Sequence, residues 1–496
     1  MQLPENLYTA EQSRQLDDLA INRFDLGGGV LMQRAGATAY ATLRHRWPSA
    51  THIMVICGPG NNGGDGYIVA ALAHKEGLTV SVRYLGDLGS QNGDALDARK
   101  AYQNGGGEIE SFDGSLLSGY DVIVDALLGT GLERPVEGVW ADAIEAMNHS
   151  GAPILALDIA SGLHADSGRI LGCAIKADAT SVFIGLKAGI FTADGADSCG
   201  YIYFDDLNVP DAVYDSVTPF AKRIMPLHLQ ELLPPRKHNF HKSQSGHVLL
   251  IGGGPNMPGA VRLAAEAALY TGAGLVTVAT HPDHSRTISA ARPELIVYGI
   301  KAAKDLNPLI KSSDVIAIGP GFGRSDWAMS LLAKVLESTG PKVLDADALN
   351  LLALDANKSE EWILTPHPGE AATLLNTTSA AVQQDRFESA DKIVKRYGGI
   401  CVLKGAGTLI SDGESRLVCD CGNAALSTAG TGDLLTGAIA SFIAQGLSIK
   451  NAAATAVWVH GHAAEIIAPS GERGWLASDF LPAMRAAVQS LEFQHK

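Results

Sequence analysis

The amino-acid sequence predicts two α/β domains, each built on a largely parallel sheet that helices cover on both faces. In both halves of the chain, short β-branched or apolar runs alternate with helical segments, the pattern of a sheet buried on both sides. Between residues 208 and 246 the alternation fails and five prolines occur. A chain of 496 residues with 46% hydrophobic content is also too long for one core. We expect a first domain over residues 1–215, a linker over residues 216–240 and a second domain over residues 241–496.

The first domain is expected to begin with two helices. Between residues 9 and 47 apolar positions recur at helical spacing, interrupted by the glycines at 27–29. Strands are then expected at residues 52–57, 79–85, 121–127, 153–159, 180–185 and 201–207, separated by helices such as the one at residues 67–75.

The second domain repeats this alternation. Strands are expected at residues 247–251, 275–280, 294–300, 314–319, 342–345, 362–365 and 400–404, with helices between them and an alanine-rich helix over residues 451–468. The two halves share a class but no sequence repeat, so no duplication is inferred.

Composition and charge exclude several classes of partner. The formal net charge of -15 disfavours general binding to nucleic acids or anionic membranes, because both need a cationic face. We therefore expect small-molecule partners, with no nucleic acid and no membrane. The N-terminal residues lack a cationic segment followed by an apolar one, and no apolar run reaches spanning length, so the expected location is cytoplasmic. The six cysteines are scattered, and no disulfide is assigned.

The stretch AGTGD at residues 429–433 precedes a small, apolar run that reads as a buried helix. Glycines before a helix let backbone N–H groups converge on an anion such as a phosphate. Asp433 places a carboxylate where an anion would bind, which suggests a general base that takes a proton from a hydroxyl beside a held phosphoryl group. A plain glycine turn with a capping aspartate would also explain the pentapeptide.

A second glycine-rich loop, CGPGNNGGDG at residues 57–66, follows the first predicted strand. Its glycines satisfy the dinucleotide fingerprint GxGxxG, but Asp65 inside the loop would repel a pyrophosphate. The next strand also ends in Tyr84-Leu85-Gly86, without the acid that binds a ribose. The sequence therefore disfavours an ordinary redox domain, and the loop instead offers oxygens to a metal ion or hydrogen bonds to ribose and amide groups.

Acids also follow two further strands of the first domain. Asp125 precedes a glycine-rich loop at residues 129–135, and Asp158 precedes Ser161. Because ligands bind beyond the carboxyl ends of parallel strands, these loops are expected to converge on one site. Asp158 is the candidate acid/base, and the oxygens of Asn62, Asp125 and Ser161 suit a monovalent cation better than zinc.

Together these motifs resemble a known family of two-domain enzymes. The sequences GPGNNGGDG, DALLGTGLERP and DIASG resemble the NAD(P)H-hydrate epimerase domain, which has a Rossmann-like doubly wound sheet. In the second half, GGG at 252–254, PGA at 258–260, GPGFG at 319–323, TPHPGE at 365–370, KG at 404–405 and GTGD at 430–433 resemble ribokinase-like ADP-dependent NAD(P)H-hydrate dehydratases. Fused in this order, the halves are similar to the bifunctional nicotinamide-nucleotide repair enzymes of bacteria. Two departures are Gln33 and Ala160, where the family usually has Glu and Pro.

The resemblance implies a substrate whose reduced nicotinamide ring has added water at C6. The epimerase interconverts the R and S hydrates, and the dehydratase restores NADH or NADPH from the S hydrate. Dehydration implies phosphorylation of the hydroxyl by ADP followed by loss of phosphate, with AMP as the second product. Asp433 as a base beside a phosphate-binding turn fits that activation step.

The resemblance also assigns residues to each site. It implies that the hydrate is bound in the epimerase by Asn61, Asn62, Gly63, Gly64, Asp65, Gly129, Thr130, Gly131, Leu132, Glu133, Arg134, Pro135 and Asp158, and that Asn62, Asp125 and Ser161 hold K⁺. In the dehydratase it implies contacts to the hydrate from Ala260, Gly323, His367 and Asp433, and to the adenine nucleotide from Lys404, Gly405, Ala406, Gly407, Thr408 and Gly432. Mg²⁺ is expected at the dehydratase site, where Glu370 is a candidate ligand. A homo-oligomer is also expected.

Two other functions stay open at this point. A small-molecule kinase with a regulatory nucleotide-binding N-terminal domain would use the GTGD turn and Lys404 equally well. Alternatively, the first half could be a nucleotide-binding interaction module without catalysis, although acids at several strand ends weigh against an adaptor.

Overall fold

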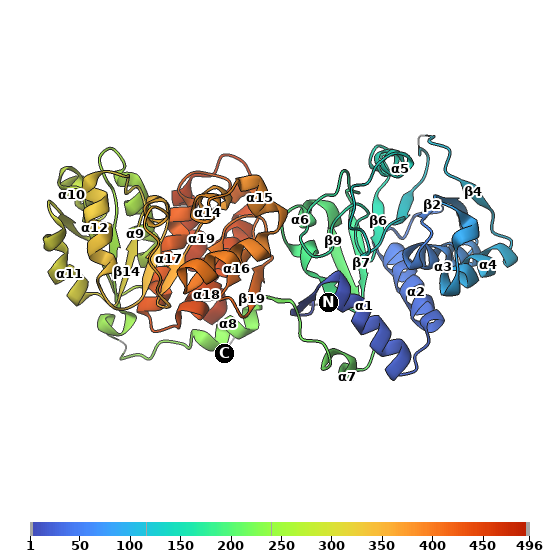
Figure 1. The fold of residues 1–496 in the computed structure, drawn as a ribbon, viewed down its shortest axis with the longest axis horizontal. Helices are drawn as coiled ribbons and strands as arrows, with labels where there is room; N and C mark the ends of the chain where they lie inside the picture. The colour runs from blue at the N-terminus through green and yellow to red at the C-terminus, as the bar shows by residue number, and fades with distance from the viewer. Residues whose placement is uncertain (1–2, 116, 240, 493–496) are drawn as a thin grey trace. The chain divides into compact units, whose positions relative to one another are not determined.

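A computed structural model describes residues 3–115, 117–239 and 241–492 of the chain. It divides into two compact units, Met1–Lys222 and Arg223–Lys496, which we call unit 1 and unit 2 (Figure 1). The division falls within residues 216–240, the expected linker, whose last residue, Phe240, lies outside the described residues. This segment contains strand β10 (Ala221–Arg223) and helix α8 (Pro226–Leu232). Within the described ranges, no helix is long and apolar enough to cross a bilayer.

Unit 1 is built on a parallel sheet with the strand order β4-β3-β2-β5-β6-β7-β9, which confirms the predicted α/β class. The strands are β2 (His52–Cys57), β3 (Thr79–Tyr84), β4 (Ile109–Ser111), β5 (Val122–Ala126), β6 (Ile154–Leu157), β7 (Ala179–Phe183) and β9 (Tyr201–Asp205). The chain adds β3 and β4 on one side of β2, and β5 on the other. Loops that follow the strands diverge at such a switch point, and the crevice between them is where ligands bind.

Helices cover this sheet. They are α1 (Ala10–Asp18), α2 (Gly28–Arg46), α3 (Asn61–Lys75), α4 (Gly93–Asn104), α5 (Val139–Asn148), α6 (Gly195–Cys199) and α7 (Asp211–Tyr214). Helices α2, α3 and α4 bury apolar residues such as Ala39, Ile68 and Ala98 against alternate residues of β2, including Ile53 and Val55. Because residues two apart in a strand share a face, this packing fixes one side of the core.

Several very short strands in unit 1 were not predicted from the sequence. Strand β4 is one, and a small ribbon in the order β10-β1-β8 contains β1 (Asn6–Tyr8) and β8 (Leu186–Lys187). Strands of two or three residues have too few alternating positions to give a periodic signal, so tertiary pairing alone reveals them.

Unit 2 has a second sheet, with the strand order β13-β12-β11-β14-β15-β16-β17-β18-β19. Its strands are β11 (His247–Ile251), β12 (Leu275–Thr280), β13 (Ile296–Gly299), β14 (Val315–Ile318), β15 (Lys342–Leu344), β16 (Trp362–Leu364), β17 (Ile400–Leu403), β18 (Thr408–Ser411) and β19 (Arg416–Cys419). All pairs up to β17 are parallel, whereas β18 and β19 add an antiparallel edge that was not predicted. The order reverses between β11 and β14, which places a second switch point there.

The helices of unit 2 lie between these strands and at the C-terminal end. They are α9 (Pro258–Tyr270), α10 (Ser285–Ala291), α11 (Asn307–Ser312), α12 (Asp326–Leu336), α13 (Asp347–Leu352), α14 (Pro368–Leu375), α15 (Ser379–Gln384), α16 (Arg386–Tyr397), α17 (Thr431–Ala444), α18 (Ile449–Ile467) and α19 (Phe480–Glu492). Helix α17, the predicted apolar helix after GTGD, is buried along its length between α9 and α18.

A glycine sets how closely α17 packs on α9. A Cβ atom added to Gly437 would lie 1.9 Å from the carbonyl oxygen of Ala264, so the two helix backbones approach more closely than any side chain allows. Because α17 carries Asp433 in its first turn, this contact also fixes where that carboxylate lies.

Replacing Gly437 with alanine is expected to lower the free energy of unfolding of unit 2 by about 1–3 kcal/mol, because overpacking outweighs the better helix propensity of alanine. Hydrogen exchange of the α17 amides measures this loss locally. Gly259→Ala is the matched control: it also lies in a helix, but no atom lies within 4 Å of the added Cβ. Equal protection of α17 in both variants would contradict the packing argument.

Candidate active sites

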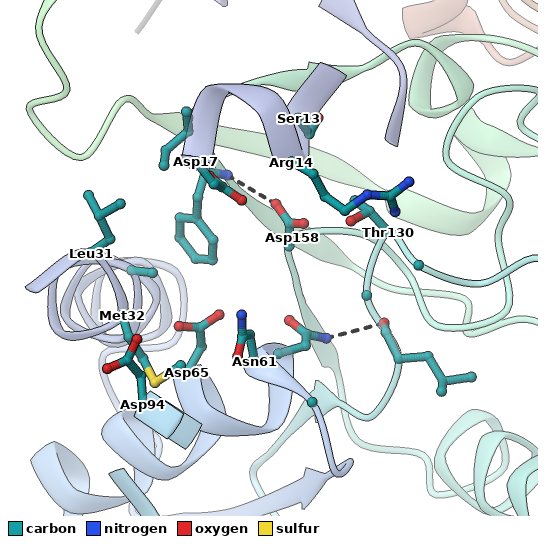
Figure 2. A pocket seen from close by; sticks show the side chains of 18 of the residues that line it. Ser13, Arg14, Asp17, Leu31, Met32, Asn61, Asp65, Asp94, Thr130 and Asp158 are labelled. Carbon is teal, nitrogen blue, oxygen red and sulfur yellow. Dashed lines mark hydrogen bonds between the residues drawn. The ribbon is translucent and has the colours of Figure 1, made fainter. Parts of the chain in front are cut away.

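A cavity of about 720 Å³ lies in unit 1, where the loops after β2, β5 and β6 meet (Figure 2). The predicted residues that line it are Asn61, Asn62, Asp65, Gly129, Thr130, Gly131, Leu132, Glu133, Arg134 and Asp158. Other predicted residues do not line it in the described part of the chain, namely Gly63, Gly64, Asp125, Pro135 and Ser161. The strand-end loops therefore come together, as the sheet topology requires, with some of their residues behind the cavity wall.

Glycines allow the loop after β2 to approach its neighbours. A Cβ atom on Gly58 would lie 1.9 Å from the carbonyl oxygen of Leu127, and one on Gly63 would lie 2.0 Å from the carbonyl oxygen of Gly58. Helix α3 begins directly at Asn61, so its first turn and its free N–H groups border the cavity.

Behind the cavity, oxygen atoms cluster around Ser161. Its hydroxyl donates to Asp125 Oδ1 at 2.6 Å, and it accepts from the N–H of Leu128 at 2.8 Å. The side-chain amide of Asn62 donates to the carbonyl oxygen of Leu128 at 3.2 Å, which leaves Asn62 Oδ1 buried without a hydrogen-bond partner. Burial raises the pKa of Asp125 to about 6, against the opposing effect of the hydrogen bonds from Ser161. An orphaned amide oxygen beside carbonyl, hydroxyl and carboxylate oxygens fits a hard cation such as K⁺.

Asp158 sits directly after β6 in a strained backbone conformation, with φ at 66°. Its N–H donates to the carbonyl oxygen of Ser181 at 2.7 Å, and its carboxylate forms an ion pair with Lys187. Lys187 is only 2% exposed and comes from the segment that follows β7. Non-glycine residues with positive φ are uncommon and often occur at functional sites, and the ion pair with Lys187 fixes this carboxylate on the cavity wall.

A second carboxyl group, that of Asp65 in α3, also lines the cavity. In Figure 2, Asp158 lies above the open centre and Asp65 below it, and the carboxyl group of Asp65 points toward that space. Asp65 is 9% exposed. Burial, repulsion from Asp158 and repulsion from Asp17 raise its pKa well above the ordinary range, and Lys187 only partly opposes this.

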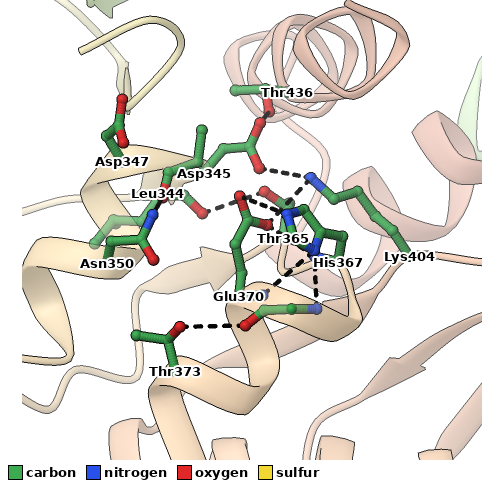
Figure 3. Close-up of polar contacts among 12 residues, drawn as sticks. Leu344, Asp345, Asp347, Asn350, Thr365, His367, Glu370, Thr373, Lys404 and Thr436 are labelled. Carbon is green, nitrogen blue, oxygen red and sulfur yellow. Dashed lines mark hydrogen bonds and ion pairs between the residues drawn. The ribbon is translucent and has the colours of Figure 1, made fainter. Parts of the chain in front are cut away.

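The second site, in unit 2, is a cluster of acidic side chains around Lys404 (Figure 3). Lys404 Nζ lies 2.8 Å from Asp345 Oδ1 and 3.7 Å from Glu370 Oε2. The hydroxyl of Thr436 in α17 donates to Asp345 Oδ2 at 2.7 Å. Burial alone would lower the pKa of Lys404, but attraction to Asp345 and Glu370 outweighs it and raises the pKa. Lys404 is therefore a fixed cation at the carboxyl ends of β15 and β17.

Asp433 joins this cluster from the first turn of α17. The turn before it uses Gly430 with φ at 95°, and a Cβ atom on Gly432 would lie 3.4 Å from Lys404 Nζ. Burial, followed by repulsion from Asp345, raises the pKa of Asp433 to about 7, although Lys404 opposes the shift. A carboxylate with such a pKa suits a general base near neutral pH.

His367 and Glu370 form the N-terminal cap of α14. His367 Nδ1 accepts from the N–H of Gly369 at 2.9 Å, and Glu370 Oε2 accepts from the N–H of His367 at 2.8 Å. The His367 side chain is 55% exposed. Its role in hydrate binding stays a prediction, and its capping bonds give it a structural role as well.

The predicted nucleotide loop, residues 404–408, is held by a buried guanidinium. Arg386, 1% exposed, donates to the carbonyl oxygens of Leu403 and Gly407, both at 3.3 Å, and to Gln383 Oε1 at 3.0 Å. A Cβ atom on Gly405 would lie 2.5 Å from this guanidinium. Because the loop carbonyls turn inward onto Arg386, the conformation of the loop is fixed without a ligand.

Ala260 and Gly323, the two remaining predicted residues, lie at the switch point of this sheet. Ala260 is in the first turn of α9, and a Cβ atom on Gly321 would lie 3.1 Å from its methyl group. The N–H of Gly323 donates to Asp347 Oδ2 at 2.8 Å. The two loops therefore meet beyond the ends of β11 and β14.

Sequence reasoning missed several side chains that shape these sites, namely Asp17, Lys187, Asp345, Arg386 and Thr436. Asp345 could have been predicted as a site residue, because it ends a predicted strand. Ligands bind beyond the carboxyl ends of parallel strands, and this principle had already identified Asp125 and Asp158. The others carry no local signal, because Lys187 and Thr436 matter only through acids far away in the chain.

Comparisons with known proteins match both halves of the chain. The family described as NAD(P)H-hydrate dehydratase matches residues 248–483, and the family described as YjeF-related protein N-terminus matches residues 28–189. Bifunctional NAD(P)H-hydrate repair enzymes from Coxiella burnetii and Escherichia coli are 45% and 39% identical, over 97% and 98% of this chain and 99% and 94% of their own lengths.

One solved structure similar to this chain is an ADP/ATP-dependent NAD(P)H-hydrate dehydratase from Bacillus subtilis co-crystallised with ATP and Mg²⁺. It has 29% identity and a TM-score of 0.51, over 54% of this chain and 98% of its own. A ribokinase-like superfamily protein from Enterococcus faecalis has 28% identity and a TM-score of 0.51, over 54% of this chain and 95% of its own. Both support a ribokinase-like α/β fold within this chain.

Proposed function

The chain belongs to the family of bifunctional NAD(P)H-hydrate repair enzymes, and from this premise we infer that unit 1 is the epimerase and unit 2 the dehydratase. Unit 1 interconverts the R and S hydrates at C6, and unit 2 dehydrates the S hydrate with ADP, giving NAD(P)H, AMP and phosphate. One observation carries the division: each unit has its own cluster of acids beyond the carboxyl ends of its parallel strands. The kinase alternative is not favoured, because relatives that match nearly the whole chain are repair enzymes.

In unit 2, we propose that Asp433 removes the proton from the C6 hydroxyl. The hydroxyl oxygen then forms a bond to the terminal phosphorus of ADP, and the bond from that phosphorus to the bridging oxygen breaks to release AMP. In the second step the C6–O bond breaks, the electron pair leaves with phosphate, and loss of a C5 proton restores the reduced ring. The raised pKa of Asp433 supports the first role, because a base with a pKa of about 7 is both available and strong enough at neutral pH.

The same cluster supports the proposed nucleotide site. Residues 404–408 and Gly432 would hold the adenine nucleotide, with Lys404 neutralising its phosphates. Ala260, Gly323 and His367 would contact the hydrate. Glu370 is 8% exposed and faces Lys404, so it can hold Mg²⁺ together with nucleotide phosphates, a typical arrangement for this ion. When bound, Mg²⁺ would neutralise charge that develops on the transferred phosphoryl group.

In unit 1, the hydrate would occupy the cavity, with Asp158 transferring protons at C6. The loops at residues 61–65 and 129–135, most of whose residues line the cavity, would bind the rest of the hydrate. K⁺ would lie behind it against Asn62, Asp125 and Ser161, where it would hold the loops after β2, β5 and β6 together. Cytoplasmic location and homo-oligomeric assembly stay predictions.

A mixture of both NADH hydrates tests this function. Wild-type protein with ADP, or separately with ATP, should restore the near-ultraviolet absorbance of the whole mixture, because the epimerase supplies the dehydratase with S hydrate. Recovery of only the S fraction would contradict the epimerase assignment, and no recovery with either nucleotide would contradict the dehydratase assignment.

Replacing Ser161 with alanine is expected to raise the KCl concentration for half-maximal epimerisation about tenfold, because one oxygen is lost and Asp125 loses its hydroxyl donor. The assay follows conversion of pure S hydrate to R hydrate without nucleotide. Ser118→Ala, at an exposed serine outside the cavity, is the control and should keep the wild-type KCl dependence. An unchanged KCl dependence of Ser161→Ala would exclude this cluster as the K⁺ site.

A further inference from the structure

Two carboxyl groups face the unit 1 cavity from different elements. Asp158 follows β6 and carries the ion pair with Lys187, whereas Asp65 projects from α3 on the other side of the open space in Figure 2. Asp65 differs from Asp158 in its surroundings: it is 9% exposed, and no hydrogen bond or ion pair of its carboxyl group occurs among the described contacts. A buried carboxyl without a partner is costly unless it is protonated or a ligand completes it.

Inversion at a carbon that bears a leaving oxygen has a known requirement. In inverting glycoside hydrolysis, a carboxylic acid on one face protonates the leaving oxygen, while a carboxylate on the other face activates the water that enters. The C6 carbon of the hydrate is chemically similar, because the adjacent ring nitrogen can stabilise the cation left when the C–O bond breaks. Exchanging the R and S hydrates therefore calls for proton-transfer groups on both faces of C6.

We propose that Asp65 is the second proton-transfer residue of the epimerase and acts on the face of C6 opposite Asp158. This inference rests on the epimerase function proposed above. The carboxylic acid of Asp65 donates its proton to the C6 hydroxyl, the C6–O bond breaks, and water leaves as the ring nitrogen forms a double bond to C6. A second water adds to the other face while Asp158 takes one of its protons, and the electron pair returns to nitrogen.

This step conserves atoms and charge. One water leaves and one enters, and one proton moves from Asp65 through the substrate and water to Asp158. The reverse reaction uses the same two residues with exchanged roles, so a single site serves both epimers. The raised pKa of Asp65 is consistent with a proton on that residue at the start of the step, and Lys187 offsets the charge of Asp158.

The test uses pure S hydrate of NADH in ¹⁸O-labelled water with K⁺ and no nucleotide, so that dehydration does not occur. Chromatography measures the R hydrate and mass spectrometry its label. Asp65→Asn and Asp158→Asn should each lower kcat about 10²-fold with KM within about threefold, the usual scale for loss of one acid or base. Asp97→Asn, an exposed acid of α4 outside the cavity, should leave the rate unchanged.

Wild-type protein should also insert one labelled oxygen from solvent at each inversion. This measurement does not depend on whether Asp65→Asn folds. An Asp65→Asn rate within threefold of wild type, or an R hydrate that keeps its original oxygen beyond the no-enzyme control, overturns the proposal and leaves the epimerase function standing. A wild-type protein that does not interconvert the hydrates overturns both.

Discussion

Replacing Asp433 with asparagine is expected to lower the rate of ADP-dependent dehydration of S hydrate about 10³-fold, because the variant cannot accept the hydroxyl proton. Asparagine keeps the shape of the side chain and removes a charge from a cluster of three acids, so α17 should stay folded. The KM for ADP should not rise, since the variant removes a repulsive charge rather than a phosphate contact. Recovery of absorbance at saturating substrate measures the rate.

The raised pKa of Asp433 also predicts the direction in which the dehydration rate changes with pH. Asp433 must be ionised to act as a base, and burial followed by repulsion from Asp345 raises its pKa to about 7. The wild-type dehydration rate should therefore rise with pH through about 7 and level off above it. The same shift destabilises the folded protein, because a carboxyl with a raised pKa favours folding only while it is protonated. That contribution is lost as pH rises from about 4 toward 7.

The two effects together separate catalysis from folding. Asp433→Asn should be no less stable than wild type above pH 7 while it has lost dehydration. Asp326→Asn, which changes an exposed first-turn acid of another helix, α12, is the matched control and should keep the wild-type rate. If Asp433→Asn dehydrates within tenfold of wild type, another group is the base.

The sequence predicted the α/β class and most strands because buried parallel strands are continuous apolar runs, as in Ile154–Leu157. It also predicted that Asp158 and residues 129–134 would meet, since loops after neighbouring parallel strands share one edge of the sheet. It did not predict the edge hairpin β18–β19 or the short ribbon of unit 1. Those elements depend on strand pairing, which no local sequence pattern indicates.

The chemical partners of the predicted acids were harder to find. Arg386 lies in a strongly amphipathic helix, where an arginine is usually solvated, yet it is 1% exposed and binds loop carbonyls. Lys187 follows a buried strand in a segment without a neighbouring acid, and its pairing with Asp158 arises from tertiary packing. A sequence shows where a strand ends but not which distant cation lies opposite it.

Lys404 is another cation whose distant acidic partners the sequence did not show. Its replacement is expected to have the second large effect on this protein. Its ammonium group lies 2.8 Å from Asp345 and 3.7 Å from Glu370, and attraction to both raises its pKa despite burial. Replacing Lys404 with methionine would leave these acids beside Asp433 with no cation among them, where an anionic nucleotide must bind. We expect kcat/KM for ADP to fall about 10³-fold, mostly through KM, which corresponds to about 4 kcal/mol.

A double variant tests whether this loss comes from the charge balance of the cluster. Because Asp345 pairs with Lys404, removing one acidic charge in Lys404→Met/Asp345→Asn should weaken the repulsion of ADP and lower its KM relative to Lys404→Met alone. Lys358→Met, at a lysine 58% exposed and 3.8 Å from Glu360, should leave dehydration unchanged. Epimerisation by every variant should stay at the wild-type rate, because that reaction belongs to unit 1. If Lys404→Met keeps its KM for ADP within threefold of wild type, the lysine holds the acids of the folded site without binding the nucleotide.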